Sequence, residues 1–191
     1  LLSTSGGDTL IINNGTYTEN ITTISHGTSS NSNVIMAEND GGVIITGGFY
    51  IETLENAFTK IIGVKFKSAE SKACALYNTK FIRCAFEGGE VCASNCDGAV
   101  NWACGSWQLY EDCWFYGVGG RYTFVAYEVD HTILRRCVIR HDGGYSADEG
   151  NPEAPIANYG SHHMSYQNVI VIDNTLKYTN DYTASYYVTG H

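Results

Sequence analysis

The sequence has 191 residues, of which 43% are hydrophobic and 16% are charged, whereas an average domain has about 25% charged residues. This composition excludes a disordered chain, and no apolar run approaches the roughly 18 residues of a membrane span. Because 11 Lys and Arg stand against 20 Asp and Glu, the net charge is −9, and we expect neither a nucleic-acid partner nor membrane insertion.

Short apolar runs follow one another along the chain, separated by Gly, Asn, Asp and Ser. They lie at residues 10–12, 34–36, 43–45, 61–64 and 169–172. No long stretch carries the apolar stripe of an amphipathic helix, and the 14 Tyr and 7 Phe are residues that favour strands. The pattern predicts an all-β fold, and the irregular gaps between the runs favour parallel strands over tight hairpins.

The first part of the chain carries a motif. The sequence GDTLII at 7–12 is followed by GTYTENI at 15–21, VIMA at 34–37 and VIITGG at 43–48. This run resembles the first coil of pectate-lyase-like right-handed β-helices, strongly over residues 6–48 and more weakly to residue 175. That scaffold serves lyases, hydrolases, phage spikes and non-catalytic surface proteins, so the resemblance implies a fold and no single activity. Since a cap helix commonly precedes the motif, we expect the chain to be a segment of a longer one.

A repeat follows the motif. Five segments share one shape: 62–66, 82–86, 111–115, 135–139 and 167–171. Their third and fifth positions are apolar and predict two core columns, because side chains two apart on a strand share a face. The columns are Val64, Cys84, Cys113, Cys137 and Val169, and Phe66, Phe86, Phe115, Ile139 and Val171. The steps of 20, 29, 24 and 32 residues are typical of a solenoid with variable inserts.

These observations predict a single-stranded right-handed parallel β-helix, a solenoid, as one domain over residues 1–191. Its N-terminal coils lie at 6–48 and its repeated coils at 61–175, with inserts at 88–107 and 141–155. A β-sandwich with accidental similarity between the five segments is the alternative.

Seven cysteines leave at least one unpaired within the chain. Cys84, Cys113 and Cys137 occupy the same inward position and predict a buried thiol stack that fills space as small apolar groups. Cys92, Cys96 and Cys104 fall in the first insert, where they are candidates for a disulfide. Free thiols and a zinc site remain alternatives for these three, although the spacing is loose for zinc and no His lies nearby.

The outward positions of the repeat are candidates for glycan binding. Trp114 and Tyr116 can stack on pyranose rings, while Arg83 and Arg140, with Arg136, can hold carboxylates. The alternative is structural: Arg83, Asp112 and Arg136 alternate in sign and form a ladder of charges between neighbouring strands.

The second insert is acidic. Asp142, Asp148, Glu149 and Glu153 are candidate ligands for Ca²⁺, although their order does not match an EF-hand, and a solvated acidic loop is the alternative. The pair His162 and His163 indicates a polar turn. Asn14 and Asn20 begin N-glycosylation sequons.

Three functions fit this sequence. We favour a non-catalytic β-helix that contacts a polysaccharide or surface glycan in an extracellular appendage, at a cell surface or in a virion, and that self-associates as a filament or trimer. The alternative, implied by the resemblance, is a Ca²⁺-dependent polysaccharide lyase acting on acidic glycans, with Arg136, Arg140 and Lys177 as catalytic candidates. The calcium motif of such lyases is not visible, however. A glycoside hydrolase using Glu87 and Asp112 ranks last, since these acids occupy different columns.

Overall fold

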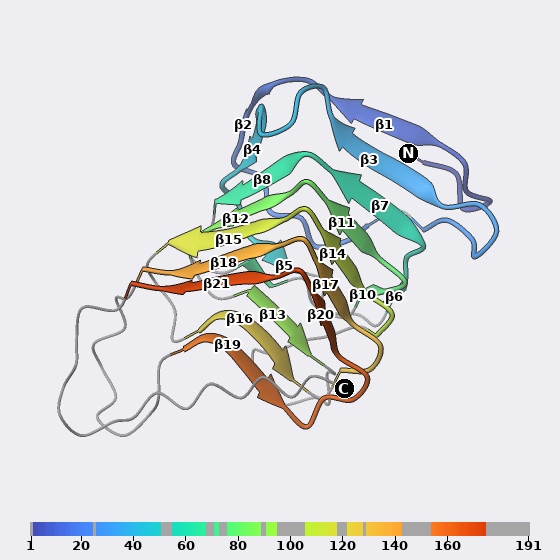
Figure 1. Ribbon diagram of the computed structural model, residues 1–191. Coiled ribbons are helices and arrows are strands. Elements are labelled where there is room, and N and C mark those ends of the chain that lie inside the picture. Colours follow the sequence, from blue (N-terminus) through green and yellow to red (C-terminus); the bar gives the residue numbers. More distant parts are fainter. Residues whose placement is uncertain are drawn as a thin grey trace, which may run out of the picture.

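The computed structural model describes residues 2–24, 26–50, 55–67, 71–72, 76–88, 91–94, 106–117, 122–127, 129–142 and 154–174. Throughout these ranges the chain forms strands and turns and contains no helix, as the sequence predicted (Figure 1). No segment in this part is therefore a helix of the length and hydrophobicity needed to cross a membrane. All pairs of named strands in it are parallel.

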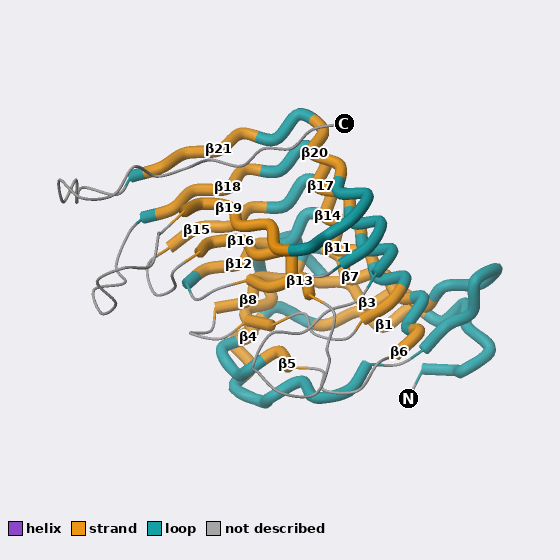
Figure 2. The backbone as a smooth tube through the Cα atoms, turned by 90° about the horizontal axis from the view of Figure 1, so that it is seen from below, coloured by secondary structure: helices purple, strands orange, loops and turns teal. Residues whose placement is uncertain are grey.

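Two seven-stranded sheets dominate the structure. Sheet 1 consists of β1 (Thr9–Ile12), β3 (Asn33–Ala37), β7 (Thr59–Ile62), β11 (Lys80–Ile82), β14 (Leu109–Glu111), β17 (Ile133–Arg135) and β20 (Ser165–Gln167). Sheet 2 consists of β2 (Gly15–Tyr17), β4 (Val43–Ile45), β8 (Val64–Lys67), β12 (Ala85–Glu87), β15 (Trp114–Gly117), β18 (Val138–His141) and β21 (Ile170–Asp173). Strands stand in chain order in both sheets, so one strand of each forms a rung, and the rungs stack (Figure 2).

A smaller sheet packs against these two. It consists of β13 (Val91–Ser94), β16 (Tyr122–Tyr127) and β19 (Ala154–Tyr159), and β13 lies within the segment 88–107 that the sequence predicted as an insert. Two short pairs complete the described strands: β5 (Phe49–Tyr50) with β9 (Ser71–Lys72), and β6 (Glu55–Asn56) with β10 (Leu76–Tyr77). The ring of Phe124 on β16 lies 5.5 Å from that of Tyr110 in sheet 1 and 5.4 Å from that of Phe115 in sheet 2.

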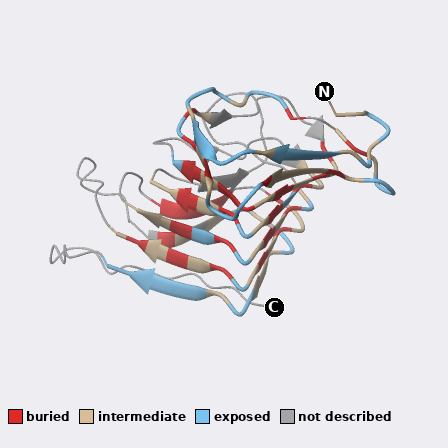
Figure 3. Ribbon diagram, turned by 90° about the horizontal axis from the view of Figure 1, so that it is seen from above, coloured by how far each residue is buried: buried red, intermediate tan, exposed pale blue. Residues whose placement is uncertain are grey.

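The core consists of side chains stacked from rung to rung. Phe86 stacks on Phe66 at 5.2 Å and on Phe115 at 4.9 Å between ring centroids, and Phe81 stacks on Tyr110 at 5.0 Å. The two predicted core columns are buried along four rungs, which confirms the prediction there. On the last described rung Val169 is half-buried and Val171 is 41% exposed, because β21 is the outermost described strand of its sheet (Figure 3).

The prediction that each of the five repeated segments is one strand was wrong. Each segment begins at the end of a strand of sheet 1 and continues into a strand of sheet 2. Their second position forms the first bend, the turn from sheet 1 into sheet 2, with φ between 51° and 72° at Gly63, Arg83, Asp112, Arg136 and Asn168. The left-handed conformation disfavours residues other than glycine. Here the amides of the bend donate to the next rung, for example Arg83 N–H to Glu111 O at 2.9 Å, so the ladder continues through the turn.

A second bend precedes the strands of sheet 1 in the same way. It has φ between 42° and 62° at Phe58, Asn78, Trp107, His131 and His163. Each of the last four stands two residues before its strand begins, so the side chains at this bend stand next to one another on successive rungs. The two bends and the two sheets thus fix which residues of different repeats become neighbours.

Candidate functional site

The outer face of sheet 2 carries two of the predicted outward columns in register. Lys65, Ala85, Trp114, Val138 and Ile170 are Cα partners across neighbouring strands. So are Lys67, Glu87, Tyr116, Arg140 and Ile172. The pairing brings aromatic and cationic groups from three rungs, β8, β15 and β18, onto one surface.

We call the group of Lys65, Trp114, Tyr116 and Arg140 the aromatic patch. Trp114 is 44% exposed, and its ring centroid lies 4.4 Å from that of Tyr116. The guanidinium of Arg140 lies 5.7 Å from the Trp114 ring and 5.5 Å from the Tyr116 ring, and the ammonium of Lys65 lies 5.8 Å from the Tyr116 ring. An exposed indole with a cation beside it offers a sugar ring both a flat apolar surface and hydrogen-bond donors.

Glu87 ties the lysines to the aromatic patch. Lys65 forms an ion pair with it, Lys67 Nζ lies 3.2 Å from its Oε1, and Tyr116 OH donates to its Oε2 at 3.2 Å. The hydrogen bond from Lys65 is the main reason that the pKa of Glu87 lies below its usual value. Glu87 therefore stays ionised at neutral pH, where it holds Tyr116 and both ammonium groups in place.

Arg140 and Asp142 form an ion pair with three hydrogen bonds. Arg140 Nε donates to Asp142 Oδ1 at 2.8 Å and Nη2 donates to Oδ2 at 2.9 Å, and the carboxylate also accepts from Gly117 N–H and Asn174 Nδ2. Burial raises the pKa of Asp142, but these donors outweigh it and the net pKa is lowered, while the pKa of Arg140 is raised. Both oxygens of this candidate Ca²⁺ ligand thus accept hydrogen bonds from the protein.

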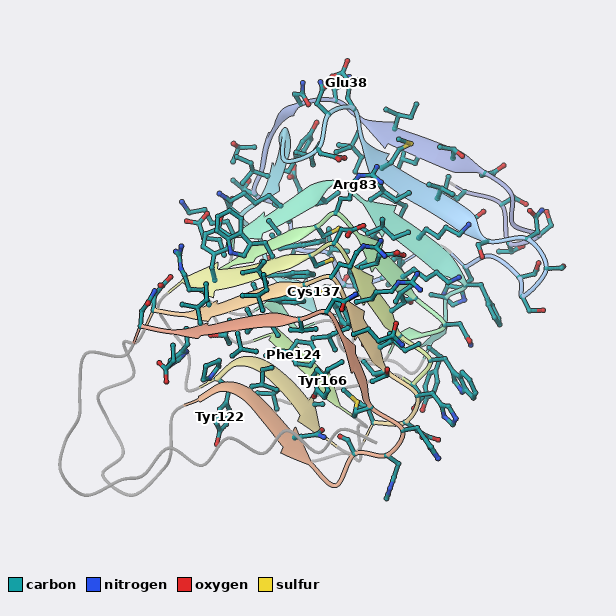
Figure 4. All side chains as sticks on the ribbon, viewed as in Figure 1. Glu38, Arg83, Tyr122, Phe124, Cys137 and Tyr166 are labelled. Atoms are coloured by element: carbon teal, nitrogen blue, oxygen red, sulfur yellow. The ribbon has the colours of Figure 1, made fainter. Side chains whose placement is uncertain are left out.

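Arg83 and Arg136 lie on the first bend and not in the aromatic patch. Arg136 pairs with Asp112 at 2.7 Å and with Glu111 at 2.5 Å, and Arg83, which is labelled in Figure 4, pairs with Asp40 at 2.6 Å. The pKa of Asp112 is lowered chiefly by its hydrogen bond from Arg136, whose own pKa is raised. The Asp112–Arg136 pair is one step of the ladder of charges that the sequence suggested as the structural alternative, whereas the ion pair of Arg83 is with Asp40, which that ladder did not include.

The three core cysteines are free thiols, and all are buried. Each thiol donates to a carbonyl of the preceding rung: Cys84 to Ile61 at 3.4 Å, Cys113 to Phe81 at 3.4 Å and Cys137 to Tyr110 at 3.3 Å. Burial raises the pKa of the Cys113 thiol. Because all three thiols are buried and each donates to a carbonyl, they fill space in the core as small apolar groups.

Several candidates from the sequence lie outside the described residues: Lys177, Asp148, Glu149, Glu153, Cys96 and Cys104. Of Cys92 the structure describes only the backbone, in β13. Both sequon asparagines are exposed, and the Asn20 side-chain oxygen accepts from Gly48 N–H at 2.8 Å.

The sequence analysis missed one cluster, Asp130, His131 and His163, and interpreted His163 as part of a polar turn. A signal for it existed. His131 and His163 are separated by 32 residues, the same step that separates Cys137 from Val169, so they occupy equivalent positions in successive repeats. Aligning the whole repeat, rather than its strands alone, would have placed them side by side.

Comparisons of the chain with protein-family models, with curated proteins and with solved structures found no match. The fold and the site geometry are therefore the basis for assigning a function.

Proposed function

We propose that this chain is a right-handed parallel β-helix of the pectate-lyase-like kind, and that it acts as a non-catalytic, glycan-contacting rod. Strand order supports the helix, because successive strands alternate between two parallel sheets and stack in chain order. Handedness follows from general experience, since crossovers between parallel strands are right-handed in about 98% of cases. A solenoid of this kind presents a long outer sheet, which suits contact with an extended polymer.

The aromatic patch is the observation that carries the glycan proposal. A pyranose ring stacks on the exposed face of Trp114, and Tyr116 widens the apolar surface. Arg140 carries a positive charge at neutral pH, as arginine does in proteins, and its remaining N–H groups can donate to a sugar hydroxyl or carboxylate. Asp142 fixes the direction of that guanidinium, so little side-chain freedom is lost on binding.

The ion pairs around the aromatic patch favour glycan binding over the elimination reaction of a polysaccharide lyase. A lyase needs a base that loses its proton near neutral pH, whereas the pKa values of Arg136 and Arg140 are both raised by carboxylates. The two acids at the patch, Glu87 and Asp142, are engaged by cations. Arg136 and Arg140 thus serve as hydrogen-bond donors rather than as bases, while cations hold Glu87 and Asp142.

We place this rod in an extracellular appendage, at a cell surface or in a virion, where it self-associates. The outermost described strands support self-association, because β1 exposes Leu10 and Ile11 and β21 exposes Ile170 and Ile172. Apolar edge strands of this kind pair readily with strands of another chain. Imaging of the purified protein by electron microscopy tests this point, and monomers at all concentrations would contradict it.

Glycan binding is tested on an array that includes neutral and uronate-containing polysaccharides. We expect Trp114→Ala to weaken binding by up to about tenfold, since an aromatic stack contributes about 0.5–1.5 kcal/mol. Trp107→Ala is the matched control, because Trp107 is 56% exposed but lies on the second bend. Equal losses in both variants, or no binding by the wild-type protein, would overturn the glycan proposal.

The same protein is then incubated with polyuronates and Ca²⁺. We expect no rise in the absorbance of unsaturated uronate. A rise that disappears in Arg140→Ala would show a lyase and would overturn the non-catalytic assignment, while leaving the glycan contact in place.

A further inference from the structure

Three side chains with metal-binding atoms meet on the second bend. Asp130 and His131 belong to one rung and His163 to the next, and one donor atom from each lies within 4.8 Å of the others. Asp130 Oδ2 lies 2.9 Å from His131 Nδ1, and its Oδ1 lies 2.6 Å from His163 Nδ1. Imidazole nitrogen and carboxylate oxygen are the donors that zinc and related transition metals take from proteins.

The backbone holds these residues together before any ligand binds. Both histidines have a left-handed conformation, with φ of 53° at His131 and 50° at His163, which places them at equivalent points of successive rungs. His131 N–H donates to His162 O at 3.3 Å, and Trp107 N–H donates to Asp130 O at 3.0 Å. Because the ladder sets the distance between rungs at about 4.8 Å, the three side chains share one corner of the molecule.

Aromatic stacking orients His131. Its ring lies 3.8 Å from the Trp107 indole, nearly parallel at 8°, and 4.4 Å from the His163 ring at 22°. The side chain of His131 is 34% exposed and that of His163 is 67% exposed. The His131 ring is thus held between the rings of Trp107 and His163, whereas the His163 side chain lies at the surface.

We infer that Asp130, His131 and His163 bind a divalent transition-metal ion, with zinc as the representative case. In a tetrahedral site with bonds of about 2.0–2.1 Å, ligand atoms lie about 3.4 Å apart. Each contact between an Asp130 oxygen and an imidazole nitrogen must therefore lengthen by less than about 1 Å. The exposed His163 ring leaves the stack so that its lone pair points toward the ion. His163 then carries its ring proton on Nε2, so Nδ1 exchanges its hydrogen bond with Asp130 for a bond to the ion, and water completes the coordination.

This site differs from the metal sites that the sequence suggested. Calcium prefers oxygen ligands and six to eight of them, whereas two of the three donors here are imidazoles. The cluster also contains no cysteine, so it is separate from a zinc site built on Cys92, Cys96 and Cys104.

Calorimetric titration of the intact chain with Zn²⁺ tests the inference. We expect one ion per chain at this site, a loss of affinity of at least about tenfold in His163→Ala and in Asp130→Asn, and no competition from excess Ca²⁺. His162→Ala is the matched control, because His162 is exposed in the same turn and outside the cluster, and it should keep the wild-type affinity. Circular dichroism shows whether each variant keeps the β fold.

Cobalt identifies the ligands independently of affinity. Co²⁺ bound to this cluster gives visible bands of an imidazole and carboxylate site, without the intense thiolate-to-metal absorption of a cysteine site. Wild-type affinity in folded His163→Ala would place the ion outside this cluster, and thiolate absorption alone would place it on cysteines. Either result would overturn the inference. Absence of Zn²⁺ binding by the wild-type protein would overturn it as well.

Discussion

Phe115 tests the assignment of the core most directly, because its side chain contacts all three main sheets. It lies on β15 of sheet 2 and is fully buried. Its ring stacks on Phe86 at 4.9 Å and meets Tyr110 of sheet 1 edge-on at 5.7 Å and Phe124 of the third sheet at 5.4 Å. Phe115→Ala removes these ring contacts together and leaves a cavity between two rungs.

We expect Phe115→Ala to lower the free energy of unfolding by about 4 kcal/mol. Truncation of a buried phenylalanine typically costs about 3–5 kcal/mol, and each lost ring pair accounts for about 0.5–1.5 kcal/mol beyond the area term. A value above the lower end of the range applies because the neighbours on all sides belong to paired strands and cannot collapse into the space. In a chain of this size such a loss lowers Tm by roughly 8–16 °C.

Trp114→Ala provides the control on the same strand. Trp114 points outward and is 44% exposed, so we expect a loss below about 1 kcal/mol. Urea unfolding followed by circular dichroism and by tyrosine fluorescence measures both variants, with the m-value compared to that of the wild-type protein. A loss in Phe115→Ala that does not exceed the loss in Trp114→Ala would refute the assignment of inner and outer faces.

Two further predictions concern charges and thiols. The pKa values of Glu111 and Asp112 are lowered chiefly by hydrogen bonds from Arg135 and Arg136 respectively, so their contribution to stability is present above the ordinary values of 4.5 and 3.8 and is lost as the pH falls through the lowered ones. Urea midpoints measured between about pH 6 and about pH 3 should therefore fall less steeply in Arg136→Gln, and an unchanged slope would contradict this pairing. Because burial raises the pKa of Cys113, this thiol should resist iodoacetamide in the native protein and react in urea, as mass spectrometry of the labelled peptides will show; labelling of native Cys113 would contradict its burial.

The alternation of apolar and polar residues predicted the faces of the strands well. Phe86 and Phe115 point inward and Trp114 points outward because side chains alternate along any strand, whatever its neighbours. The bends were missed because Arg83, Asp112 and Arg136 have no strong preference of their own for positive φ. One signal was present: buried residues around each bend are three apart and then two apart, as in Phe81, Cys84 and Phe86.

The candidate site was predictable only where the repeat itself brings residues together. Trp114 and Arg140 could be placed on one face because they occupy neighbouring columns of aligned segments. The pairing of Arg83 with Asp40 could not, since it joins residues 43 apart and requires the register of the rung that carries Asp40, which the repeat did not include. Asp142, which binds Arg140, was likewise interpreted as a metal ligand, because an aspartate in a sequence does not show which cation its carboxylate will face.

The repeats differ in length, yet both sheets advance by the same steps of 20, 29, 24 and 32 residues. The first bend takes the same number of residues in each repeat, so the differences fall in the connections that leave sheet 2 and return to the second bend. These connections can therefore differ in length while the first bend and the two sheets keep their geometry. A peptide or small domain grafted into such a connection would be displayed at a chosen height along the axis, which makes the fold suitable as a scaffold for spaced epitopes.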